Sequence, residues 1–241
     1  MTTSNQSAAS AANAQPVLRN ILIATPFTLA VPVGYGLWFH LQGIPLAWPA
    51  LGVGTAGWVI ALILRNPIAL IARATLKSWE RVQPWVVAAS GPCEEGVRVA
   101  AVLLFGRGFT SALSIGLGWA AIEVVYSIVN GLAVVSLTRR TDAKARQALQ
   151  MLNDQGLGGI FGPMAPFWGI VERIFVSGLH IGFTLLLAWQ PWLVLVTIPL
   201  HSGLNFTYLR LARRSVALAE LVMALVGLAA LLTGFAVFGR L

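Results

Sequence analysis

The chain has 241 residues, of which 57% are hydrophobic and only 10% are charged, and its mean hydropathy is +0.79. Soluble domains carry about 25% charged residues, so this composition excludes a soluble protein and predicts an all-α polytopic membrane protein. The net charge of +8 would suit a nucleic-acid partner, but most basic residues lie in short loops beside apolar segments, where Lys and Arg determine membrane topology. We therefore expect a lipid bilayer and no nucleic acid as partner.

The N-terminal segment differs from the rest of the chain. Residues 1–16 are small, polar and almost uncharged, and they lack the basic region that begins a signal peptide. This pattern predicts a disordered tail at 1–16, followed by a single membrane-embedded domain at 17–241.

Apolar segments follow one another through the remaining chain. Each is close to the ~20 residues that a membrane-spanning helix needs, and they predict about seven transmembrane helices, at 18–39, 46–64, 84–105, 110–137, 166–189, 191–209 and 216–238. Between the second and third, residues 66–82 alternate apolar and basic positions and predict either a helix in the membrane interface or a basic loop. Residues 138–158 form the longest polar loop, and the Gly- and Pro-rich stretch 156–166 predicts a loop or a short re-entrant segment.

The basic residues are distributed unequally between the two sides that seven spans define. Twelve lie on the side of the N-terminus: Arg19 at the start of the first span, and eleven in the loops after the second, fourth and sixth spans. Only Arg107 and Arg240 lie on the opposite side. The positive-inside rule therefore predicts a cytoplasmic N-terminus and an external C-terminus.

Polar side chains within the predicted spans are the most informative feature of the sequence. They are Glu94, Glu95, Arg98, Glu123, Glu172, Arg173, His180, His201 and Asn205. One ionised group at the centre of a membrane costs about 2.5–3.5 kcal/mol, and the six charged residues would together cost about 15–20 kcal/mol if unpaired. We therefore expect them to pair with one another or to line a polar cavity in the middle of the membrane, which indicates a functional site.

Four spans place such residues at similar depth. The third span contributes Glu94 and Glu95, the fourth Glu123, the fifth His180 and the sixth His201. With a rise of about 1.5 Å per residue, these side chains can share one layer of a helix bundle.

Three further residues accompany this layer. Arg98 is one turn from Glu94, in the favoured order for an ion pair, and Asn205 is one turn from His201. Pro92 is expected to kink the third span and to free backbone groups. Because Glu94 and Glu95 point about 100° apart on a helix, one of them is expected to activate water while the other holds Arg98 or a neighbouring helix.

Glu172 and Arg173 lie apart from the layer, about 12 Å along their helix from His180. We interpret them as a structural ion pair. Four carboxylates against two guanidiniums would leave the spans with a charge of −2, which a low dielectric does not sustain. The balance therefore requires a protonated carboxyl, a protonated histidine or a bound cation.

In chain order these residues read Glu-Glu-x-x-Arg (94–98), Glu123, His180 and His-x-x-x-Asn (201–205). The pattern resembles the CAAX-protease-like group of intramembrane endopeptidases, and it is most similar to the bacterial YhfC-type and PrsW-type branches. The similarity covers a core of about 84–209. The segments GLGWAAIE (116–123) and ERIFVSGLH (172–180) look like YhfC-type segments.

The resemblance implies a glutamate-dependent protease in the bacterial cytoplasmic membrane, acting on a membrane-associated peptide or protein. It implies that Glu94 or Glu95 is the base, that His180 orients the base or the water, and that His201 and Asn205 stabilise the oxyanion. Arg98 and Glu123 would support them.

One position departs from the pattern: YhfC-type sequences usually carry a histidine where this chain has Trp119. This departure argues against a metal ion at the position of Trp119, and we expect no cofactor. Zinc remains an alternative, with ligands among Glu94, Glu95, Glu123, His180 and His201. The alternative function is a non-catalytic membrane protein, such as a degenerate protease-like binder, an immunity protein or a transporter, that uses the same cavity.

Overall fold

The structure is a computed structural model that describes residues 2–76, 78–140, 142–154 and 163–240, with side chains except those of residues 2–16, 79 and 151–154. Every regular element in these ranges is a helix, in the order α1 (Thr2–Leu41), α2 (Trp48–Leu76), α3 (Trp79–Ala88), α4 (Ser90–Phe105), α5 (Phe109–Thr138), α6 (Ala143–Asp154), α7 (Ala165–Trp189), the short 3₁₀ helix η2 (Pro191–Leu193), α8 (Val194–Ala212) and α9 (Val216–Ala236). Within the described ranges six helices are long and apolar enough to cross a membrane. The predicted all-α polytopic fold is confirmed.

The predicted third span differs from the other six, because two helices, α3 and α4, replace one continuous helix at 84–105. The break is at Ala89, three residues before Pro92, which has no N–H to donate to the carbonyl of Ala88. The hydroxyl of Ser202 on α8 donates to that carbonyl at 2.8 Å, and the N–H of Gly91 donates to the same hydroxyl at 3.1 Å. The expected effect of Pro92 is therefore present, and a neighbouring helix satisfies the freed backbone.

Helix boundaries also differ from the predictions elsewhere. Residues 66–76 continue α2 as helix past Pro67, so this part of 66–82 is helical and not a loop. The polar segment 138–158 contains α6. Most of the Gly- and Pro-rich stretch 156–166 lies outside the described residues. The backbone of α1 is already helical in the segment predicted as a tail, and its apolar span begins at Val17.

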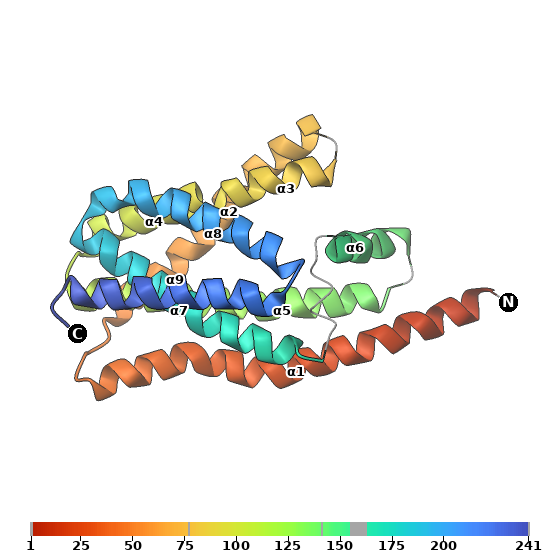
Figure 1. Cartoon of the computed structure of the whole chain (residues 1–241), viewed down its shortest axis with the longest axis horizontal. Helices are drawn as coiled ribbons and strands as arrows, with labels where there is room; N and C mark the ends of the chain where they lie inside the picture. Colours follow the sequence, from red (N-terminus) through yellow and green to blue (C-terminus); the bar gives the residue numbers. More distant parts are fainter. Residues whose placement is uncertain (1, 77, 141, 155–162, 241) are drawn as a thin grey trace.

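Helix α7 is the central element of the bundle (Figure 1). In α7, 67% of the most apolar window is buried, against 33% or less in the other five candidate spans. Glycines permit this enclosure, since a Cβ on Gly227 of α9 would collide with the backbone of Phe175, and one on Gly182 would collide with the backbone of Ala230. The close approach of α7 and α9 fixes the helix that carries His180.

The outer faces of the helices are apolar, as expected for contact with lipid. Exposed side chains on α1 include Leu22, Phe27 and Val33, and on α9 they include Leu225 and Leu232. Exposure of such apolar faces to water is unfavourable, whereas contact with the hydrocarbon chains of a lipid bilayer is not.

We predict opposite effects of alanine at two helical glycines. Gly227→Ala should lower the free energy of unfolding by about 1–3 kcal/mol, because the methyl group meets the Phe175 backbone. Gly52→Ala, at a position with open space around the new Cβ, should leave stability unchanged or raise it by up to about 1 kcal/mol. Thermal and denaturant unfolding in detergent measure both, and equal effects would contradict this packing.

Candidate active site

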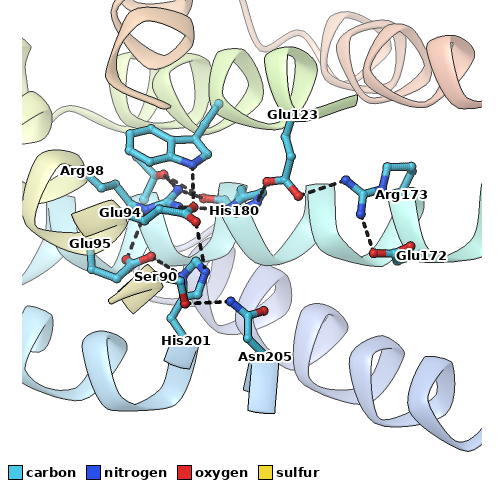
Figure 2. Close-up of polar contacts among 12 residues, drawn as sticks. Ser90, Glu94, Glu95, Arg98, Glu123, Glu172, Arg173, His180, His201 and Asn205 are labelled. Carbon is cyan, nitrogen blue, oxygen red and sulfur yellow. Dashed lines mark hydrogen bonds and ion pairs between the residues drawn. The ribbon is translucent and has the colours of Figure 1, made fainter. Parts of the chain in front are cut away.

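The site is a layer of charged and polar side chains from four helices (Figure 2). Helix α4 contributes Glu94 and Glu95, α5 contributes Glu123, α7 contributes His180 and α8 contributes His201. The contacts described below join all five. The prediction that these residues share one layer is therefore confirmed, although they come from spans that are far apart in the sequence.

Arg98 lies at the centre of the layer and is fully buried. Its Nη1 donates to the carbonyl oxygen of His180 and to Oγ1 of Thr184, each at 3.0 Å. Its Nε is 3.2 Å from Oε2 of Glu95, and its Nη2 is 3.9 Å from Oε2 of Glu94. The predicted ion pair with Glu94 is thus the longer of two, and Arg98 mainly ties α4 to α7.

The contact between Arg98 and His180 determines the protonation of the imidazole. Arg98 Nη2 lies 2.9 Å from Nδ1 of His180, and a guanidinium can only donate. Nδ1 must therefore accept, which leaves the proton on Nε2. Nε2 lies 2.5 Å from Oε2 of Glu123 and donates to it. His180 is consequently a neutral imidazole in this arrangement, oriented by Arg98 on one side and Glu123 on the other.

His201 lies between the two adjacent glutamates. Its Nδ1 is 2.8 Å from Oε1 of Glu95, and its Nε2 is 3.5 Å from Oε1 of Glu94. Because both ring nitrogens face carboxylates, His201 is placed to carry a proton on each. Glu95 is the carboxylate that holds Arg98 and His201, whereas Glu94 faces the middle of the layer.

Two partners of Glu94 were not foreseen as site residues. Arg65 of α2, interpreted from sequence as a topology-setting loop residue, forms an ion pair with Oε1 of Glu94. Trp119 is fully buried, its indole N–H donates to Oε2 of Glu94 at 3.2 Å, and its ring lies 4.2 Å from the guanidinium carbon of Arg98. A tryptophan buried in a span needs an acceptor for its N–H, and this signal could have identified Trp119.

Glu172 and Arg173 form the expected ion pair, at 2.5 Å. Arg173 is also 2.9 Å from Oε1 of Glu123 on α5. Since the other oxygen of Glu123 contacts His180, this pair is connected to the layer through one side chain. The prediction placed Glu172 and Arg173 apart from the layer because it considered only their distance from His180 along α7.

Asn205, predicted to stabilise an oxyanion beside His201, uses one N–H of its amide for Oγ of Ser90, at 2.8 Å. Ser90 begins α4 and was not recognised from the sequence. The second N–H of the amide is the one that Asn205 can offer to a ligand.

A further buried acid, Glu220 of α9, was also missed. It accepts a hydrogen bond of 2.7 Å from the hydroxyl of Tyr208, and its other oxygen is buried without a hydrogen-bond partner among the described residues. Its location within the last apolar span was the available signal.

Inclusion of Arg65 changes the charge balance of the site. Glu94, Glu95, Glu123 and Glu172 now face three guanidiniums, those of Arg65, Arg98 and Arg173, which leaves −1 instead of the expected −2. A single additional proton, for which His201 is placed, neutralises the cluster. A divalent cation would overcompensate it.

The hydrogen bonds of the candidate metal ligands determine whether these residues suit zinc. One ligand atom each of Glu94, Glu123 and His180 lie within 4.8 Å of one another. A histidine that ligates metal donates its other ring N–H to an acceptor. In His180 the nitrogen beside Glu123 carries the proton, and the other nitrogen faces a guanidinium, so these residues do not fit zinc unless Arg98 moves.

We predict that Arg98→Met destabilises the protein by about 3–5 kcal/mol, because it leaves the buried Glu95 without its cation. Adding Glu95→Gln should restore part of that loss, as measured by a double-mutant cycle in denaturant unfolding. Arg140→Gln, which removes an exposed ion pair with Asp142, is the control and should leave the unfolding midpoint unchanged. Additive effects of the two site substitutions would contradict the pairing.

We also predict that the folded protein does not need a divalent metal. A chelator should leave the thermal unfolding midpoint unchanged, and elemental analysis of the purified protein should find no stoichiometric zinc. One zinc ion per chain, lost in Glu123→Gln, would show that Arg98 does move and that the layer binds metal.

No protein-family model matches this chain, and no curated protein or solved structure is significantly similar to it. Function must therefore be inferred from the chemistry of the site itself.

Proposed function

We propose that this protein is an intramembrane endopeptidase in which Glu94 activates the water that hydrolyses a peptide bond of a membrane-associated protein or peptide. The observation that carries the proposal is the convergence of Glu94 with two imidazoles from different helices. His201 Nε2 is 3.5 Å from Oε1 of Glu94, and Glu94 also converges with Glu123 and His180.

The geometry suits one reactive water. Three atoms within 4.8 Å of one another have a common point within about 2.8 Å of each, which is the usual length of a water hydrogen bond. A water at that point contacts Glu94, Glu123 and His180 together. Glu94 can then take one proton of the water while Glu123, which His180 holds in place, accepts the other O–H.

The proposed reaction proceeds in two steps. Glu94 takes a proton from the water as its oxygen bonds to the carbonyl carbon, and the resulting oxyanion accepts hydrogen bonds from His201 and the free N–H of Asn205. Collapse of this intermediate breaks the C–N bond, and the proton on Glu94 passes to the leaving nitrogen. Glu95 positions His201 throughout.

One observation favours a non-catalytic alternative. Arg65 forms an ion pair with the oxygen of Glu94 that faces His201, and a carboxylate held by a guanidinium is a weak base. If Arg65 does not leave when a ligand enters, the same layer serves a protein that binds a peptide without cleaving it.

We predict that Glu94→Gln lowers the rate of cleavage by about 10²–10⁴-fold, the usual contribution of a general base, in a variant that still unfolds cooperatively. The assay uses purified protein in detergent and a fluorogenic library of membrane peptides. Glu95→Gln and His180→Ala should lower activity through loss of positioning. Glu80→Gln, at an exposed acid of α3, is the matched control and should retain full activity.

Cleavage by Glu94→Gln at the wild-type rate would overturn the assignment of the base. If the wild type cleaves no peptide of the library while Glu94→Gln melts at a higher temperature, the non-catalytic alternative is favoured. A higher melting temperature of Glu94→Gln would show that the charge of Glu94 destabilises the folded protein, which indicates a carboxylate retained to bind a ligand.

A further inference from the structure

We propose that Arg65 is a specificity residue that binds a carboxylate of the substrate, and that this binding frees Glu94 for the reaction. The inference rests on the proposed function, since it names a chemical group of the substrate and the event that releases the base. It concerns a residue that takes no part in the reaction described above. A peptide without a carboxylate near the cleaved bond would leave the ion pair between Arg65 and Glu94 intact.

The guanidinium of Arg65 has more hydrogen-bonding capacity than its contacts use. Its Nη2 contacts Oε1 of Glu94, while its Nε–H is buried and has no acceptor in the part of the chain that the structure describes. Nε and Nη2 form one edge of the guanidinium, and the two N–H groups of such an edge match the two oxygens of a carboxylate. Glu94 therefore occupies half of this edge, and a carboxylate that occupies both halves would bind Arg65 more tightly.

The other two arginines of the cluster are held by more partners. Arg98 has contacts on all three nitrogens of its guanidinium, and Arg173 uses two nitrogens for two different carboxylates. The side chain of Arg65 is 21% exposed, against 11% for Arg173 and 0% for Arg98. Arg65 is therefore the cation of the cluster that an incoming group can reach with the loss of a single contact.

The exchange of partners does not leave Glu94 without hydrogen-bond donors. The indole N–H of Trp119 donates to its Oε2 at 3.2 Å, and Nε2 of His201 lies 3.5 Å from its Oε1. A buried carboxylate that keeps these partners avoids the penalty of an unsatisfied polar group. Arg65 can therefore transfer to the substrate while Glu94 stays in the layer.

The position of the ion pair favours a peptide carboxylate over a lipid phosphate. Arg65 contacts the oxygen of Glu94 that faces His201, and Figure 2 shows Glu94 within the layer beside His201. The phosphate of a lipid headgroup stays outside the hydrocarbon core of the bilayer. A carboxylate attached to the peptide enters the layer with the bond to be cleaved, and it leaves this oxygen of Glu94 free to accept a proton from water.

A binding experiment with three peptides tests the proposal. The probes are dansyl-labelled leucine–alanine peptides that end in a free carboxylate, in an amide, or in a glutamate followed by an amide. Binding to the full chain in phosphatidylcholine nanodiscs is followed by dansyl fluorescence, with the integrity of each peptide checked by mass spectrometry. The wild type should prefer the free acid or the glutamate peptide to the plain amide by about tenfold or more. Whichever of the two binds more tightly identifies the source of the carboxylate.

Variants separate recognition from structure. Arg65→Lys keeps the charge but lacks the edge that holds both carboxylate oxygens, so it should lose the preference. Glu94→Gln removes the internal competitor for Arg65 and should bind the carboxylate peptide more tightly than the wild type does. Arg73→Gln, at an exposed arginine of the same helix, is the matched control and should keep the wild-type preference. Because the peptides are compared within each variant, a loss of stability does not imitate a loss of preference.

Three results would overturn the proposal. The first is equal affinity of the wild type for all three peptides, or no binding of any of them. The second is a preference that Arg65→Lys leaves unchanged. The third is weaker binding of the carboxylate peptide by Glu94→Gln than by the wild type, because a purely structural ion pair predicts that result and a competing one predicts the opposite.

The failure of this inference can be distinguished from failure of the proposed function. A preference that depends on Arg65, in a protein that cleaves none of the peptides, would support the carboxylate site and favour the non-catalytic alternative. Cleavage of all three peptides with equal kcat/KM, abolished in Glu94→Gln, would support the protease and reject the role of Arg65.

Discussion

The structure depends on one buried guanidinium. Arg98 has no exposed surface, and it contacts the carboxylate of Glu95, the imidazole and carbonyl of His180 and the ring of Trp119. An uncompensated charge at this depth would be strongly destabilising, so three helices must keep their relative positions to satisfy it. The same contacts give His180 its tautomer, contribute to the charge balance and occupy both ring nitrogens of His180 as long as Arg98 keeps its position. The properties of the layer are therefore consequences of where one arginine is held.

Much of this arrangement could be predicted from the sequence because charged residues inside apolar segments have few options. The depths of Glu94, Glu123, His180 and His201 follow from the rise of a helix, and the structure places their side chains in contact. The helical class and the apolar spans follow from composition and segment length. These inferences succeed because the membrane penalises unpaired charge and unpaired backbone alike.

The sequence was least informative where a partner comes from a different helix. Arg65 was assigned to a loop because the apolar segment ends beside it, but α2 continues past it and turns its side chain toward Glu94. Arg173 was placed apart from the layer because only distance along α7 was considered, while Glu123 reaches it from α5. In both cases the contact depends on the length of a side chain and on how two helices cross. The hydrophobic periodicity within one segment carries no information on either.

The break at Ala89 has a mechanical consequence. Bilayers vary in thickness, and a protein adapts to hydrophobic mismatch by tilting or bending its helices. Since Ser202 takes the carbonyl that Pro92 leaves free, the joint at Ala89 has its backbone satisfied without a continuous helix. Helix α3 therefore need not continue the axis of α4, and Ser202 joins the end of α3 and the start of α4 to α8. The same hydroxyl lies beside the contact between Glu95 of α4 and His201 of α8 in the sequence of both helices, so the joint and the site share one attachment between these helices.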